Sequence, residues 1–195
     1  MPTARFYKES IYGATLYNGD PDQKITLTSY PFDWMEASFF YMNIEDEQLC
    51  RTNIQGDRFC QGYKDKGFNF KIRLKKEGIL PAIAIGINDI AGNGFYSSEY
   101  IIGSYGINNL DLHFGLSWGQ LNGSNSSFKN PFGYISEDFF NRKDNLDGSG
   151  GQFQPSRYFS GEESSPFFGF AYAANNKILV KFETDNTVTP GKVGY

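Results

Sequence analysis

The stretch FNFKIRLK, residues 68–75, alternates apolar and polar side chains without exception. Because successive side chains of a β-strand point to opposite faces, the stretch predicts a strand with one apolar and one basic face. In a soluble protein the apolar face packs against a core, whereas in an outer-membrane barrel it meets lipid and the charges meet a wet lumen. The apolar set is Phe68, Phe70, Ile72 and Leu74, and the polar set is Asn69, Lys71, Arg73 and Lys75. The orientation of this strand therefore decides the fold class.

Eight further segments alternate in the same way, and no stretch shows a helical period. The nine predicted strands span residues 10–17, 24–30, 34–44, 67–75, 82–88, 95–104, 110–118, 167–174 and 177–185. The composition agrees, since aromatic residues make up 17% of the chain and glycine is abundant, as β structure favours. We expect one all-β domain over residues 1–195, built as an antiparallel up-and-down meander.

The connections between these strands are unequal at the two ends of the meander. Two alternate connections are long and polar, about residues 45–66 and 119–166, while the connections at the other end are short. Outer-membrane barrels show this asymmetry, with tight periplasmic turns and long extracellular loops. Several predicted strands are also close to the roughly 9–11 residues that a tilted strand needs to cross a bilayer. The pattern favours part of a transmembrane barrel, with both long segments as surface loops.

The net charge and the hydropathy of the chain argue against a nucleic-acid-binding protein and against a helical membrane protein. The net charge of −4 argues against a nucleic-acid partner. No apolar run approaches the roughly 20 residues of a membrane helix. The first ten residues, MPTARFYKES, lack the apolar core of a signal peptide. We therefore expect either a cytosolic protein or a mature or truncated form of an exported one.

The two cysteines, Cys50 and Cys60, lie close together in a polar segment. A disulfide is the simplest interpretation, and it implies an oxidising compartment such as the periplasm or the cell surface. The alternative is a pair of free thiols in a cytosolic loop. A zinc site would need about four ligands at close spacing, and His113, the lone histidine, is far away.

The sequence predicts no catalytic residue, metal or cofactor. His113 stands beside Asp111, but no nucleophile motif accompanies them. The glycine-rich stretch NLDGSGGQ, residues 145–152, matches neither a phosphate-binding loop nor a calcium loop. A carboxylate pair for glycoside cleavage cannot be recognised from spacing alone.

In the barrel interpretation the polar faces line the lumen. The predicted lumen-facing residues are Asn69, Lys71, Arg73, Lys75, Asp111, His113, Lys181 and Glu183. The row of lysine and arginine would favour anionic permeants such as an acidic polysaccharide. The alternative interpretation is an ordinary solvated sheet face.

Three stretches resemble the YjbH/GfcD-like family of bacterial exopolysaccharide and capsule proteins. They are PFDWMEASFFYMNIED (31–46), DKGFNFKIRLKKEGILPAIAIGINDIAGNGFYSSEYI (65–101) and GINNLDLHFGLSWGQLNG (106–123). The resemblance covers roughly residues 4–133. Asp89, Asn93 and Glu99 match the family motif at a loop, and we expect them to order the rim.

This resemblance implies a Gram-negative outer-membrane barrel that takes part in the export or assembly of an extracellular polysaccharide. Its implied partners are outer-membrane lipid, the polysaccharide and other exopolysaccharide-export proteins, with no catalytic residue. Family members are several times longer, so nine strands are expected to form an incomplete barrel, which lipid would not tolerate alone. Two alternatives remain: a soluble secreted β-sandwich that binds carbohydrate through exposed aromatic residues, and an enzyme with a carboxylate pair in a groove.

Overall fold

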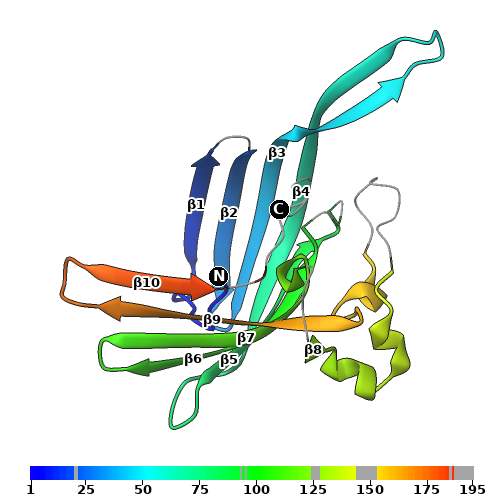
Figure 1. The fold of residues 1–195 in the computed structure, drawn as a ribbon. Coiled ribbons are helices and arrows are strands. Elements are labelled where there is room, and N and C mark those ends of the chain that lie inside the picture. The colour runs from blue at the N-terminus through cyan, green and yellow to red at the C-terminus, as the bar shows by residue number, and fades with distance from the viewer. Residues whose placement is uncertain are drawn as a thin grey trace.

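In the described part of the chain, nine strands follow one another through one antiparallel sheet in the order of the sequence (Figure 1). The computed structural model describes residues 1–19, 22–92, 94, 96–123, 128–143, 153–184 and 186, with the side chains at 44–49, 51 and 61 left out. The strands are β1 (Ile11–Asn18), β2 (Asp22–Phe32), β3 (Met35–Thr52), β4 (Arg58–Lys75), β5 (Ala82–Ile90), β6 (Ser98–Ile107), β7 (Leu110–Gly119), β9 (Glu163–Ala173) and β10 (Leu179–Thr184). The predicted all-β antiparallel meander is confirmed.

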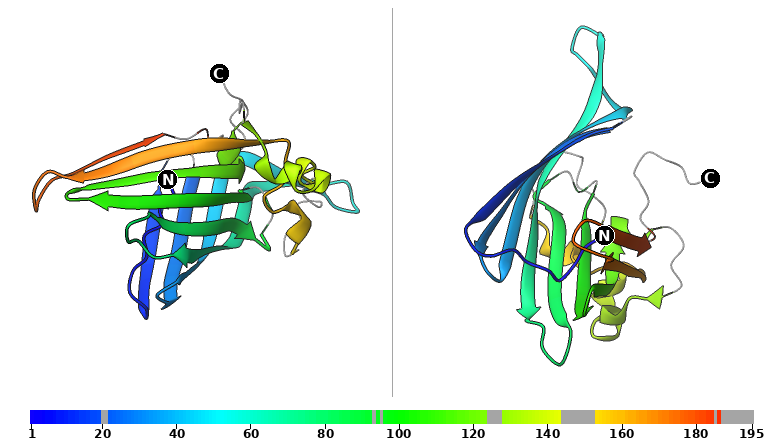
Figure 2. Two further views of the ribbon diagram at one scale, coloured as in Figure 1. Left: turned by 90° about the horizontal axis from the view of Figure 1, so that it is seen from below. Right: turned by 90° about the vertical axis from the view of Figure 1, so that its left-hand side faces the viewer.

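The sheet does not close into a barrel within the described residues. Its order begins at β1 and ends at β10, and each of these strands pairs on one side only. The sheet is strongly curled, and the strands at its two ends run in clearly different directions (Figure 2). Curling follows from the right-handed twist that accumulates across neighbouring strands.

The strand register aligns a continuous set of apolar side chains on one face of the meander. Leu27 of β2 lies opposite Phe39 of β3, which lies opposite Phe68 of β4. The same face continues from Phe114 of β7 to Phe168 of β9. We call this the outer face, and the face that carries Lys71 the inner face.

The exposed side chains of residues 68–75 show which face of this strand is packed. Phe68 and Leu74 are 46% and 60% exposed, whereas Lys71 is only 8% exposed. The apolar side chains are therefore turned away from the packed side of the sheet, and the charged ones are turned toward it. This is the reverse of the arrangement in a soluble sandwich.

The buried core lies on the inner face and is small. Tyr100 covers Gly86, where a Cβ would come within 2.1 Å of the tyrosine ring, and Phe167 covers Gly115 in the same way. The glycines of the inner face therefore leave room for neighbouring rings. The core cluster comprises Ala4, Ala82, Ala84, Tyr100, Ile102 and Phe167.

The segment predicted as a loop at about residues 45–66 is mostly strand, which corrects that expectation. β3 and β4 continue past the sheet as a paired ribbon and turn at residues 53–57 (Figure 1). Asn53 Oδ1 accepts hydrogen bonds from the backbone N–H groups of Gln55 and Asp57, which shapes the turn. A ribbon without a core beneath it needs no apolar face, so its sequence carries no alternation.

The segment predicted as a loop at about residues 119–166 holds short elements where it is described. Four of them are 3-10 helices, namely η1 (Gln120–Asn122), η2 (Pro131–Tyr134), η3 (Glu137–Phe140) and η4 (Pro155–Arg157). The other is the two-residue strand β8 (Phe128–Lys129). β9 begins at Glu163, earlier than predicted, and includes Pro166 opposite Leu116 of β7. No helix among the described residues is long and apolar enough to cross a membrane.

Candidate functional site

An N-terminal strap, residues 1–7, lies across the inner face of the sheet. The backbone N–H of Ala4 donates to Ser104 Oγ at 2.8 Å, and Lys71 Nζ donates to the carbonyl oxygen of Arg5 at 2.9 Å. Ala4 is buried in the core cluster, with Met1 and Phe6 packed beside it. The strap therefore fills the space that the curl of the sheet encloses, from β4 to β7.

Arg5 is the electrostatic centre of this strap. Its guanidinium bonds Asp111 through two nitrogens, with Nε 2.9 Å from Asp111 Oδ2, and it also bonds Glu77. Bidentate pairing of this kind is the strongest form of the arginine–carboxylate bond. The predicted lumen residue Asp111 is thus a partner of the strap.

The basic row of β4 is neutralised by neighbours. Lys71 Nζ lies 2.6 Å from Glu36 Oε2, and Arg73 lies 3.8 Å from Asp33 Oδ2. Both cations also sit over the ring of Phe6, each 4.5 Å from its centroid. The row faces the inner side, but its charge is compensated where the strap covers it.

The remaining predicted lumen residues are distributed unevenly. Asn69 donates to Ser38 and accepts from the backbone of Asp89. Lys75 ends β4 beyond an irregularity in its pairing with β5. Lys181 and Glu183 lie on the edge strand β10, where both are exposed, and Glu183 pairs with the amino group of Met1.

Ser104, His113 and Asp111 form a chain of contacts beneath the strap. His113 Nδ1 lies 2.8 Å from Ser104 Oγ, and Nε2 lies 3.7 Å from Asp111 Oδ2. The serine hydroxyl is fully buried and already accepts the N–H of Ala4. A substrate has no access to this hydroxyl, so the geometry suits a hydrogen-bonded support for the strap.

A second polar region lies at the loop end of the sheet, where residues 128–143 and 153–161 contain side chains that pack against β6 and β7. Trp118 is fully buried on the outer face and packs on Phe132 and Phe159. Asn130 Nδ2 donates to the carbonyl oxygens of Phe139, Phe159 and Gly161. We call this structure the rim.

Glu99 is fully buried in the rim, and the cation that neutralises it is half-buried. Arg142 holds both oxygens of Glu99, at 2.7 and 2.9 Å, and its guanidinium also donates to Ser97 and to backbone carbonyl oxygens. The N–H of Phe159 donates to the same carboxylate. Glu99 therefore ties the loop to the sheet.

Asp89 lies at the end of β5, next to the loop that leads to β6. It is buried in a left-handed backbone conformation, and its Oδ2 accepts from the N–H of Tyr96. Asn93, the third residue of the predicted rim motif, lies outside the described residues.

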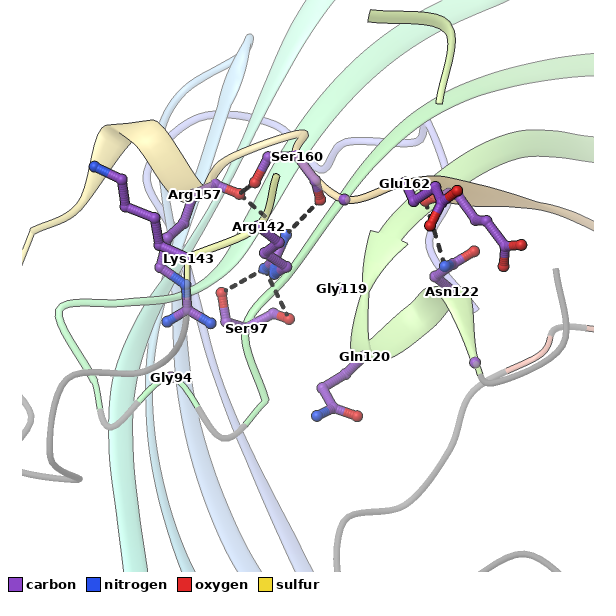
Figure 3. A pocket seen from close by; sticks show the side chains of 13 residues that line it. Gly94, Ser97, Gly119, Gln120, Asn122, Arg142, Lys143, Arg157, Ser160 and Glu162 are labelled. Atoms are coloured by element: carbon purple, nitrogen blue, oxygen red, sulfur yellow. Dashed lines mark hydrogen bonds between the residues drawn. The ribbon is translucent and has the colours of Figure 1, made fainter. Parts of the chain in front are cut away.

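A polar pocket of about 760 Å³ opens at the rim, between the loop and the ends of β6 and β7 (Figure 3). Its walls include Ser97, Gln120, Asn122, Arg142, Lys143, Arg157 and Glu162. The sequence analysis did not single out Arg142, Arg157 or the strap residue Arg5. The only local signal was the pair Arg142–Lys143, which follows an aromatic stretch in an otherwise polar loop.

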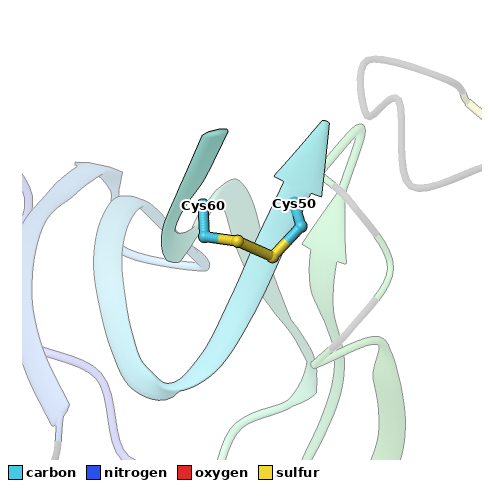
Figure 4. The surroundings of a disulfide bond; sticks show 2 residues. All are labelled: Cys50 and Cys60. Atoms are coloured by element: carbon cyan, nitrogen blue, oxygen red, sulfur yellow. A yellow bond between two sulfur atoms is a disulfide. The ribbon is translucent and has the colours of Figure 1, made fainter. Parts of the chain in front are cut away.

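Cys50 and Cys60 lie directly opposite one another on the projecting β3–β4 ribbon and are joined by a disulfide (Figure 4). Each cysteine lies three positions from the turn at 53–57, so the bond closes the ribbon just before its tip. No cluster of potential metal ligands occurs among the described residues.

These features define a class of protein: an antiparallel meander with an apolar outer face, a charged inner face filled by its own strap, and a polar rim. Comparison with known families shows which family the chain belongs to. Residues 1–188 match the family described as exopolysaccharide biosynthesis protein YbjH, and the chain belongs to this YjbH family.

One curated relative and the solved structures complete the comparison. The chain is 32% identical over 173 residues to the "Uncharacterized lipoprotein YjbH" of Escherichia coli strain K12. The matched part is 88% of this chain and 24% of the relative, so the chain spans about a quarter of the relative's length. No solved structure matches the chain.

Proposed function

We propose that this chain is part of an outer-membrane β-barrel that takes part in the export or assembly of an extracellular polysaccharide. The observation that carries the proposal is the orientation of the sheet, with apolar side chains exposed on the outer face and charged ones packed on the inner face. Lipid is the surrounding that accepts a broad exposed apolar face.

The family supports the second half of the proposal. Its description names exopolysaccharide biosynthesis, and the Escherichia coli relative is named as a lipoprotein, a class of protein anchored to membranes. The open edges at β1 and β10 are expected to pair with further strands, because a bilayer does not accept unpaired backbone groups. The proposal assigns no catalytic step to the chain.

Fractionation tests the membrane half. The protein that carries this chain is expressed in a Gram-negative host, and inner and outer membranes are separated on a density gradient. We expect the protein in the outer-membrane fraction, extractable with detergent but not with carbonate or high salt. Recovery in the soluble periplasmic fraction would instead support the secreted carbohydrate-binding module.

Deletion tests the polysaccharide half. Removal of the gene is expected to lower the cell-surface polysaccharide, and a plasmid copy is expected to restore it. Unchanged surface polysaccharide in the deletion strain would refute this half, whatever the location of the protein. If single Asp or Glu replacements abolished turnover of a polysaccharide by the purified protein, an enzyme would be the better assignment.

A further inference from the structure

The rim pocket offers a binding site for a ligand. We infer that it binds an acidic sugar unit, with the sugar carboxylate on Arg157 and the sugar hydroxyls on the opposite wall. This inference rests on the proposed function, since it names the kind of polysaccharide that the protein meets.

The pocket has the size and position of a binding site. Its volume of about 760 Å³ lies inside the range of about 300–1,000 Å³ that small-molecule sites occupy. Its walls come from segments far apart in the sequence: the approach to β6, the end of β7, and the loop residues around Arg142 and Arg157. The Glu99–Arg142 pair fixes these walls to one another.

The two arginines of the pocket have different roles. Arg142 uses its donors within the protein, on Glu99, Ser97 and the carbonyl oxygen of Ser160. Arg157, in contrast, has a buried Nε with no hydrogen-bond partner among the described residues. This nitrogen is enclosed by the protein, but Arg157 as a whole is half-buried and lines the pocket. An arriving carboxylate would therefore meet the accessible part of the side chain, where a charge-assisted hydrogen bond to a guanidinium is strong.

The charges around Arg157 point to an anion. Burial, followed by the charge of Arg142, lowers the pKa of Arg157, which means that its cation is not fully compensated. Asp89 and Glu99 act on it electrostatically, but Glu99 is already held by Arg142. A bound carboxylate would supply the missing negative charge in the planar form that a guanidinium recognises.

The opposite wall suits hydroxyl groups. Figure 3 shows Glu162 and Asn122 on the side of the pocket away from Arg157, with Gln120 below them. Carboxylates and amide oxygens accept hydrogen bonds, and sugar hydroxyls donate them. The aromatic rings of the rim are packed on one another around Trp118, so the pocket recognises polar groups rather than stacking on a sugar face.

The test is a titration of the purified full-length protein in detergent with trigalacturonate, an acidic oligosaccharide, and with maltotriose, a neutral one. We expect calorimetry to detect trigalacturonate binding that weakens with added salt, and no comparable maltotriose binding. Arg157→Gln is expected to weaken trigalacturonate binding at least tenfold. Arg157→Lys keeps the charge and loses the planar fork. Its affinity for trigalacturonate is expected to lie between those of the unmodified protein and Arg157→Gln.

Lys177→Gln serves as the matched control, because Lys177 is an exposed cation at the turn before β10, outside the pocket lining. It removes one charge and is expected to bind like the unmodified protein. Equal binding by Arg157→Gln and the unmodified protein would overturn the inference, as would the absence of trigalacturonate binding by the unmodified protein. These results are independent of the deletion experiment, so a failed pocket and a failed export function are distinguishable.

Discussion

At the residue scale, the rim depends on one buried carboxylate. Glu99 is fully buried and receives two bonds from Arg142 and one from the backbone of Phe159. Removal of one member of a buried ion pair leaves the other charge without a partner, and the cost is about 3–5 kcal/mol. The stability of the rim therefore depends strongly on the side chain of Glu99.

We predict that Glu99→Gln lowers the free energy of unfolding by about 3 kcal/mol, because Arg142, whose side chain is only 17% exposed, loses its counter-charge. Urea unfolding of the purified protein in detergent measures the change. Glu137→Gln, at an exposed position in η3, removes the same charge without a buried partner and is expected to change stability by less than about 0.5 kcal/mol. Equal effects of the two substitutions would contradict the role of Glu99.

At the scale of elements, the β3–β4 ribbon is the part that the sheet supports least. It extends past its neighbours, and its tip residue Ile54 is fully exposed (Figure 1). Backbone pairing of β3 with β4 and the Cys50–Cys60 bond hold this end together, and none of the described side chains from Cys50 to Cys60 is buried. Elements with few buried contacts open locally at low free energy.

We predict that Cys50→Ser with Cys60→Ser makes the ribbon tip open locally, since closure of a loop of this length by a disulfide contributes about 2–3 kcal/mol. Cleavage by trypsin after the exposed Arg58 is expected to become at least tenfold faster. The midpoint of global unfolding is expected to stay the same, because the ribbon lies outside the core. Unchanged cleavage on mutation and on reduction would contradict this view.

The elements also show what could be predicted from the sequence. All nine long strands of the meander overlap their predicted ranges, because each has one apolar face and alternation reports it. The ribbon at residues 45–66 escaped prediction because neither of its faces is apolar. The rim escaped because Glu99, Arg142 and Arg157 come from separate segments whose meeting depends on the path of the loop.

At the scale of the whole molecule, the two faces of the sheet differ in how well they accept a charged side chain. Leu27 is 51% exposed on the outer face, and its neighbour Thr28 points to the inner face opposite Ser38. In a bilayer a charge on the outer face is buried in hydrocarbon, whereas a charge on the inner face stays near water.

We predict that Leu27→Arg lowers the stability of the protein folded into liposomes by about 2–4 kcal/mol, while Thr28→Arg changes it by less than about 1 kcal/mol. Refolding titrations in lipid vesicles measure both. The two variants are adjacent and carry the same charge, so only the face differs. A larger loss for Thr28→Arg than for Leu27→Arg would show that the outer face is not the lipid side.

The sequence alone determined the strand set, their antiparallel order and the separation of apolar from charged side chains, because these follow from a period of two along each strand. Only the tertiary structure decided which face is packed. The strap at residues 1–7 lies across the charged face, where Arg5 pairs with Asp111 and the ring of Phe6 covers Lys71 and Arg73. No local pattern encodes that long-range contact. The rim pocket likewise depends on segments far apart in the sequence, which the Glu99–Arg142 pair joins.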